Sequence, residues 1–143
     1  MENLLISACL LGTPCRYDGA SKKYETVEAL SKKYNLIPVC PEVLGGLPTP
    51  RTPSERIGDR VVMKDGRDVT KNYFDGAKEA LKTAKRFGCK KALLKARSPS
   101  CSPDMIYDGS FSGTLVKGEG VAAELLRREG ITVYSEEELE KLL

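Results

Sequence analysis

Short apolar runs alternate with amphipathic stretches along this chain. The apolar runs predict strands over residues 4–8, 35–39, 90–96 and 131–134. The stretches between and after them predict helices over 21–33, 71–87 and 117–129, and a last helix opened by a Ser135/Glu138 capping box. Strands that alternate with helices are typical of a parallel sheet with crossover helices. We therefore predict an α/β fold: one domain over residues 1–143, with an open, mostly parallel, Rossmann-like sheet flanked by helices.

Turn and cap residues add detail to this outline. Asp65-Gly66 predicts a small β-hairpin insertion between short strands within residues 60–69. Thr70 is expected to cap the following helix and Gly88 to end it. Two segments rich in Pro, Gly and Ser, residues 40–58 and 97–116, are predicted to be irregular. Loops of this length inside a compact domain are usually functional.

Composition and charge narrow the classes of partner. The 143 residues are 41% hydrophobic, which suffices for one core. The 23 Lys and Arg and 20 Asp and Glu are mixed along the chain, with a net charge of +3, and no basic block predicts binding to nucleic acid or a membrane. The first twelve residues lack the basic region of a signal peptide, and their apolar run is too short to span a bilayer. We expect a cytoplasmic protein, whose oligomeric state stays open.

The chain has five cysteines and no histidine. In a chain without an export signal we expect the cysteines to be reduced, so a disulfide framework is not predicted. The absence of histidine removes Cys-His and Ser-His-Asp nucleophiles, His-ligated zinc sites and the usual general base. Any catalysis would then depend on carboxylates, hydroxyls, lysines, thiolates or a metal.

Cys9, Cys40 and Cys101 each follow a predicted strand. Because the carboxyl ends of parallel strands meet at one edge of a sheet, we expect these three thiols to converge in a ligand crevice. Thiolates without histidine suit an iron-sulfur cluster or zinc, although the spacing matches neither a ferredoxin nor a zinc ribbon. The alternative is that each thiol is simply buried. We assign Cys89, at the other end of its strand, to packing, and leave Cys15 undecided.

Two polar residues accompany these cysteines. Glu42 lies two positions after Cys40, and either is solvated or transfers protons beside the metal. Ser98 lies three positions before Cys101, and either caps a turn through its hydroxyl or hydrogen-bonds a substrate.

The same loops contain arginines and aromatic residues. The arginines that flank the three cysteine segments are Arg16, Arg51 and Arg97. Each is individually a surface residue in the first interpretation. In the second, the three together neutralise an anionic cluster or hold a polar ligand. Tyr107 and Phe111 belong to a turn and, as a second interpretation, form a wall of the pocket.

Four segments together resemble a bacterial and archaeal family whose best understood members are thiouracil desulfidases. They are SACLLGTPCRYDG, CPEVLGGLPTPRTPSE, DVTKNYFDGAKEAL and ALLKARSPSCSPDMIYDGSFSGT. The resemblance spans nearly the whole chain in the same order. One departure is Ser102, which stands where the family usually has glycine after SPSC; this makes the turn geometry after Cys101 an open question.

The resemblance implies a [4Fe-4S] cluster held by Cys9, Cys40 and Cys101, with the fourth iron open. It further implies that the thiocarbonyl sulfur of a thiolated pyrimidine binds that iron, with Glu42 and Ser98 as catalytic residues. Sulfur leaves, water oxygen replaces it, and 2-thiouracil becomes uracil plus sulfide. Glu42 can move protons between the attacking water and the ring nitrogen, and the reaction requires no net redox change.

Other hypotheses remain at this point. The protein could be a desulfidase for another thiolated compound, or a non-catalytic module that binds zinc or stores a cluster. A thiol redox protein using Cys9 and Cys15 is disfavoured because their spacing is not C-x-x-C. A small chain without a basic patch suits a free thiolated nucleobase better than tRNA.

Overall fold

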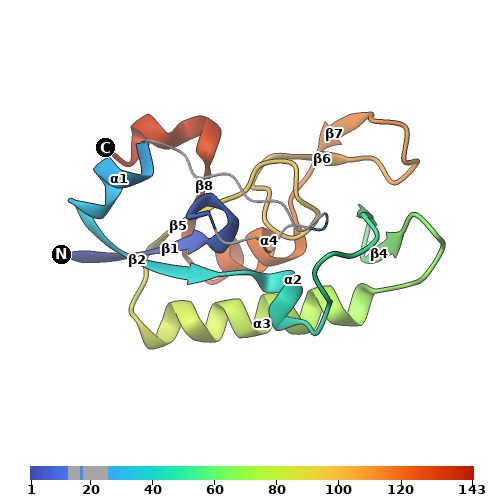
Figure 1. The fold of residues 1–143 in the computed structure, drawn as a ribbon, viewed down its shortest axis with the longest axis horizontal. Helices are drawn as coiled ribbons and strands as arrows, with labels where there is room; N and C mark the ends of the chain where they lie inside the picture. Colours follow the sequence, from blue (N-terminus) through green and yellow to red (C-terminus); the bar gives the residue numbers. More distant parts are fainter. Residues whose placement is uncertain (13–16, 18–25) are drawn as a thin grey trace.

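The structure is a computed structural model that describes residues 1–12, 17 and 26–143 (Figure 1). Cys15 and Arg16 lie outside the described residues, as do the first five residues of the helix predicted over 21–33.

The centre of the fold is a parallel sheet of four strands in the order β2-β1-β5-β8. Its strands are β1 (Glu2–Ser7), β2 (Tyr34–Val39), β5 (Lys91–Leu94) and β8 (Thr132–Ser135). All four predicted strands are present, with no end shifted by more than two residues. The predicted mostly parallel α/β fold is confirmed.

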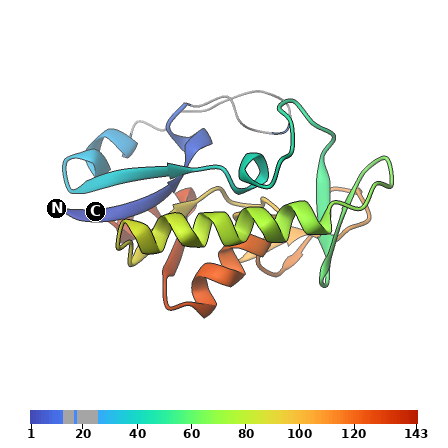
Figure 2. The same ribbon diagram turned by 90° about the horizontal axis from the view of Figure 1, so that it is seen from below.

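Helices cover both faces of this sheet (Figure 2). They are α1 (Thr26–Ser31), α2 (Pro41–Leu44), α3 (Thr70–Arg86) and α4 (Val121–Arg128), with 3₁₀ turns η1 (Ala8–Leu10) and η2 (Glu136–Lys141). Leu4 and Ile6 of β1 lie in one buried cluster with Leu30 of α1. Leu5 points to the opposite face and packs in a second cluster with residues of α3 and α4, including Leu126. This alternation along β1 is what a strand buried on both faces requires.

A predicted hairpin insertion is present, but its strands differ from the prediction. β3 (Ser54–Ile57) pairs with β4 (Arg60–Met63), so the loop predicted over 40–58 contains both α2 and a strand. Asp65-Gly66 does turn the chain, yet the returning segment makes only an isolated bridge between Val62 and Asp68. The reason is that α3 begins at Thr70 and leaves too few residues for another strand.

A second hairpin was not predicted. It pairs β6 (Met105–Tyr107) with β7 (Leu115–Lys117), inside the segment predicted to be irregular. Because β7 and Gly118 occupy the start of the helix predicted over 117–129, α4 begins only at Val121. Figure 1 shows this hairpin near β4, at the end of the molecule away from the N-terminus.

The predicted Thr70 cap is wrong, whereas the predicted end of the same helix is confirmed. Thr70 is the first residue of α3, and its hydroxyl accepts the Val61 N–H at 2.9 Å, while the Asp68 carboxylate accepts the Thr70 N–H at 2.9 Å. Gly88 ends this helix with a φ of 63°.

The chain finishes in a 3₁₀ turn, not in the predicted α-helix. The Ser135 hydroxyl caps this turn by accepting the Glu137 N–H. In a capping box it would instead accept the Glu138 N–H. Glu138 itself has a non-helical φ of −117°, which explains why no α-helix continues from this cap.

Candidate active site

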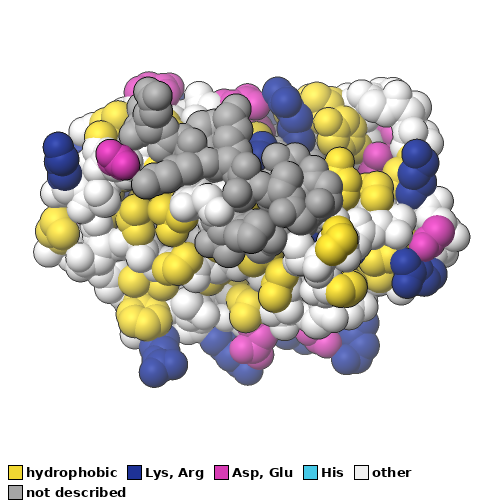
Figure 3. All heavy atoms as spheres, in the orientation of Figure 1, with side chains coloured by type: hydrophobic (Ala, Val, Ile, Leu, Met, Phe, Trp, Pro, Cys, Tyr) yellow, Lys and Arg dark blue, Asp and Glu magenta, His cyan; other side chains and the backbone are white. Residues whose placement is uncertain are grey.

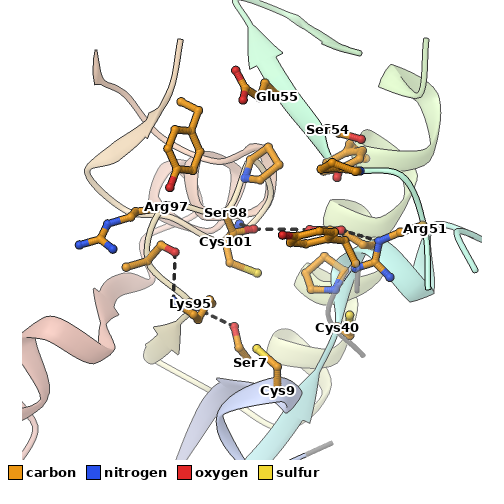
Figure 4. A pocket seen from close by; sticks show the side chains of 18 of the residues that line it. Ser7, Cys9, Cys40, Arg51, Ser54, Glu55, Lys95, Arg97, Ser98 and Cys101 are labelled. Atoms are coloured by element: carbon orange, nitrogen blue, oxygen red, sulfur yellow. Dashed lines mark hydrogen bonds and ion pairs between the residues drawn. The ribbon is translucent and has the colours of Figure 1, made fainter. Parts of the chain in front are cut away.

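The three predicted cysteines lie around one cavity at the carboxyl edge of the sheet (Figure 4). Cys9 is in η1 directly after β1, Cys40 directly precedes α2 after β2, and Cys101 is in the loop after β5. The cavity has a volume of about 530 Å³. It lies where chain connections leave the sheet in opposite directions, which is where open α/β sheets bind ligands.

Two of these thiols are deeply buried. Cys9 and Cys101 are 9% and 6% exposed, and each also contacts a hydrophobic cluster of the core. Burial raises the pKa of the Cys101 thiol to about 12, and the nearby Glu42 and Cys40 act in the same direction, while hydrogen bonds with Ser7 and Ser98 oppose the shift. Without a bound cation, Cys101 is therefore a neutral thiol at physiological pH.

Glycines fix the position of α2, the helix that follows Cys40. A Cβ added at Gly45 would clash with the Asn72 carbonyl, and one added at Gly76 would clash with the Pro41 carbonyl. The Asn72 amide also donates to Gly45 O at 2.9 Å. Because the backbones of α2 and α3 touch here, the first turn of α2 is held at the cavity wall.

Glu42 occupies that first turn and is fixed by Arg51. Nε and Nη2 of Arg51 lie 2.8 and 2.6 Å from Glu42 Oε2. The two side chains are 3% and 13% exposed. The other carboxylate oxygen, Oε1, lies 3.5 Å from the Ser98 hydroxyl. The ion pair therefore involves Oε2 of Glu42, whereas Oε1 points toward Ser98.

Ser98 shapes the turn that carries Cys101. Its hydroxyl oxygen accepts the N–H groups of Ser100 at 3.1 Å and Cys101 at 3.0 Å. The turn also rests on α4, since the Pro99 carbonyl accepts the Val121 N–H at 2.9 Å. Both interpretations of Ser98 from the sequence are thus compatible with the geometry: it caps a turn, and it faces the cavity.

Serine at position 102 does not disturb this turn. Among the described non-glycine residues, only Arg97 and Phe111 have a positive φ, so the backbone of Ser102 needs no glycine. Its buried hydroxyl donates to the Met105 carbonyl at 2.6 Å. The residue after Cys101 therefore links the turn to β6.

Tyr73 belongs to the site and was missed from the sequence. It lies on α3, lines the cavity, is 1% exposed, and hydrogen-bonds with Ser54 and Glu42. Burial, followed by the Glu42 charge, raises its pKa above the usual tyrosine value. One feature of the sequence could have indicated its role. Tyr73 is the one large residue in a row of small residues on the buried face of the helix, which includes Gly76, Ala77 and Ala80.

The two described arginines of the cysteine segments, Arg51 and Arg97, have different partners. Arg51 is in the site, and Arg16 is outside the described residues. Arg97 lines the cavity, but its guanidinium pairs with Glu137 at 3.0 Å, and Figure 4 shows it directed away from the sulfurs. Lys95 also lines the cavity, and its Nζ lies 3.1 Å from Glu136 Oε2.

Cys89 is 5% exposed and packs in the core cluster of Leu5, apart from the cavity, so its assignment to packing is confirmed. Tyr107 and Phe111 line the cavity, as the second interpretation expected.

Among the described residues, no three Cys, Asp or Glu side chains form a group that could hold a single metal ion. None of the described helices could cross a membrane.

Fold and cavity define an α/β protein with a thiol-lined pocket at the carboxyl edge of its parallel sheet. The model of the 2-thiouracil desulfurase family matches residues 4–138, and the chain belongs to this family. It is 40% identical to YbbK of Bacillus subtilis (strain 168), an uncharacterized protein, over 98% of this chain and 99% of that one. It is also similar to the solved structure of TudS, a [4Fe-4S]-dependent thiouracil desulfidase. That match has 48% identity and a TM-score of 0.94, and covers 99% of this chain and 95% of the other.

Proposed function

We propose that the protein is a [4Fe-4S]-dependent desulfidase that converts thiolated pyrimidines such as 2-thiouracil to uracil and sulfide. The observation that carries this proposal is the Glu42 carboxylate, held by Arg51 and facing Ser98 in the cavity that the three thiols line. A storage module would need the thiols alone. The similarity to a solved thiouracil desulfidase supports the same activity.

The donor set fits a cluster with one free iron. Cys9, Cys40 and Cys101 would hold it, and each thiolate would bind its own iron, so the sulfurs need to surround the cluster and not meet at one point. No histidine is available as a fourth ligand. When bound, the cluster supplies a Lewis-acidic iron for the soft substrate sulfur.

Glu42 and Ser98 manage the protons of the reaction. For a substrate bound as its thiolate, in which one ring nitrogen carries no proton, Oε1 of Glu42 takes a proton from the water that attacks the carbon and passes it to that nitrogen. The second proton of the water leaves with the sulfur as hydrosulfide when the carbon–sulfur bond breaks. The Ser98 oxygen already accepts two N–H groups, so its own proton is available to Glu42 or to the substrate. Water supplies the oxygen, sulfide leaves, and no electron is gained or lost.

Arg51 and Tyr73 hold Glu42 ready for this role. Arg51 binds Oε2 from a buried position, so the carboxylate rotates little and Oε1 stays toward Ser98. The raised pKa of Tyr73 keeps its hydroxyl protonated, so beside Glu42 it serves as a hydrogen-bond donor and not as a base.

The charge distribution on the molecular surface favours a small substrate. Figure 3 shows Lys and Arg interspersed with Asp and Glu on the described part of the face turned to the viewer. A continuous basic surface would instead favour binding of tRNA phosphates. We therefore propose a free thiolated base as substrate, and expect no salt-sensitive binding of tRNA.

The test is anaerobic reconstitution with iron and sulfide, followed by iron analysis, visible absorption with and without 2-thiouracil, and a sulfide-release assay. We expect a brown cluster whose spectrum changes with substrate, and turnover. Glu42→Gln should keep the cluster and lose turnover. Cys9→Ser should lose both, whereas Cys89→Ser, the matched control, should keep both. Zinc in place of a cluster, or full activity of Glu42→Gln, would contradict the proposal.

A further inference from the structure

The segment of residues 107–114, which we call the aromatic loop, connects β6 to β7 and has two different sides. Tyr107 and Phe111 line the cavity. The polar side chains form a separate chain of hydrogen bonds, with oxygen–oxygen distances of 2.5, 2.6 and 2.8 Å, through Asp108, Ser110, Ser112 and Thr114. Three of these four residues are exposed. The loop thus presents its aromatic residues to the cavity and its polar residues to solvent.

Glu55 of β3 ties this loop to the rest of the protein. Its Oε1 accepts the Gly109 N–H at 2.9 Å and the Phe111 N–H at 3.1 Å. Glu55 is only 8% exposed, and a buried carboxylate is costly unless donors satisfy it. Charge-assisted hydrogen bonds of this kind are stronger than neutral ones. The carboxylate of a different element therefore anchors the loop.

Two backbone features show how closely the loop is held. Phe111 has a φ of 56°, a left-handed conformation that a phenylalanine keeps only when its surroundings impose it. At Gly109, an added Cβ would clash with the Ile57 side chain of β3. Glu55 and Ile57 thus fix the loop at two points and turn Phe111 to the cavity.

We propose that Glu55 is a positioning residue that holds Phe111 as an aromatic wall, and that this wall selects heteroaromatic thiones over acyclic thiocarbonyl compounds. This inference rests on the proposed function. Glu42 and Ser98 act on the thiocarbonyl group and its neighbouring nitrogen, which a cyclic and an acyclic compound both have. An aromatic side chain stacks on a pyrimidine ring, and an acyclic compound such as thiourea offers no ring to it.

The kinetic test compares 2-thiouracil with thiourea, the latter both as substrate and as competitive inhibitor, on reconstituted protein. Phe111→Leu and Glu55→Ala should raise KM for 2-thiouracil about threefold to tenfold, the range that one lost stacking contact produces, with kcat little changed. The constants for thiourea should stay within about twofold, since no stacking is lost. Glu55→Gln keeps an acceptor oxygen and should restore the wild-type KM. A fall in kcat on both compounds in Glu55→Gln would instead make Glu55 a proton-transfer group and overturn the inference.

Hydrogen exchange tests the anchor, the two hydrogen bonds from the loop to Glu55, without any measurement of enzyme activity. The Gly109 and Phe111 amides should be protected in the wild type and in Glu55→Gln, and should exchange about tenfold faster in Glu55→Ala. Glu119→Ala is the matched control, because Glu119 pairs with Arg127 at 2.7 Å and is not among the residues that line the cavity. Unchanged exchange in Glu55→Ala overturns the anchor. Absence of wild-type turnover on 2-thiouracil overturns the proposed function and the selectivity, while the exchange result still decides the anchor.

Discussion

Two walls of the cavity are held in place by different means. α2, which carries Glu42, is fixed by backbone contact with α3, where Gly45 and Gly76 leave no room for a side chain. The aromatic loop is held chiefly by the Glu55 carboxylate. A backbone contact permits almost no adjustment, whereas a side-chain acceptor can be changed by one substitution. This contrast teaches that the wall for which we propose proton chemistry is built rigidly, and that the wall that we propose to face the substrate ring can be altered by a single substitution.

The largest effect is expected from breaking the backbone contact of the first wall. Gly76→Ala forces a methyl group against the Pro41 carbonyl, so α2 must move with Cys40 and Glu42. We expect a loss of about 3 kcal/mol, the upper range for overpacking, together with loss of cluster binding, measured by thermal unfolding and iron content. Gly88→Ala is the control, because its Cβ would meet open space. It should cost about 1–2 kcal/mol for the left-handed φ and retain iron. Wild-type stability of Gly76→Ala would show that the two helices are not in tight contact.

The sequence predicted the first wall much better than the second. β1, β2 and β5 follow from apolar runs, and parallel strands place the residues after them at one edge, so the convergence of Cys9, Cys40 and Cys101 could be expected before any coordinates. Glu42 and Ser98 were found because they lie within three residues of those cysteines.

The residues missed from the sequence depend on contacts between distant segments. Glu55 lies in a Pro-rich stretch, and only its bonds to Gly109 and Phe111, 54 and 56 positions away, show its role. The sequence predicts a loop at β3 because the Asp65-Gly66 turn signal favours pairing of residues 60–63 with the segment that follows the turn, whereas in the structure they pair with β3. Local propensity says nothing about such pairings, since the free energy that stabilises them comes from tertiary contacts.

The next largest effect concerns the ion pair on the first wall. Arg51→Gln leaves the Glu42 carboxylate without its buried partner, and should cost about 3 kcal/mol in unfolding free energy. The double variant Glu42→Gln/Arg51→Gln should recover part of this loss, because no charge is then left unpaired. Arg127→Gln, which breaks an exposed pair with Glu119, should cost under about 1 kcal/mol. Denaturant unfolding of all four proteins checks this; equal losses for Arg51→Gln and Arg127→Gln would mean that burial does not matter here.

A smaller effect separates backbone strain from ring contacts in the second wall. Phe111→Ala and Phe111→Gly both remove the ring, but only glycine tolerates the φ of 56° at no cost. We expect Phe111→Gly to be more stable than Phe111→Ala by about 1 kcal/mol, as measured by thermal unfolding. The opposite order would show that residue 111 relaxes out of the left-handed region once the ring is gone.

The smallest effect is expected at the start of α3, the helix against which the first wall packs. The Asp68 carboxylate accepts hydrogen bonds from Thr70, and these, with a minor contribution from Arg60, lower its pKa below 3.8. A carboxyl group whose pKa is lower in the folded state adds stability above its unfolded pKa, and loses it as the pH falls through the folded value. Asp68→Asn should therefore lower Tm slightly at pH 7, and the difference from wild type should shrink below about pH 4. A Tm difference that is constant from pH 7 to pH 3 would show that the Asp68 charge does not cause the effect. The backbone contact with α2 would then be the main interaction that fixes the first turn of α3.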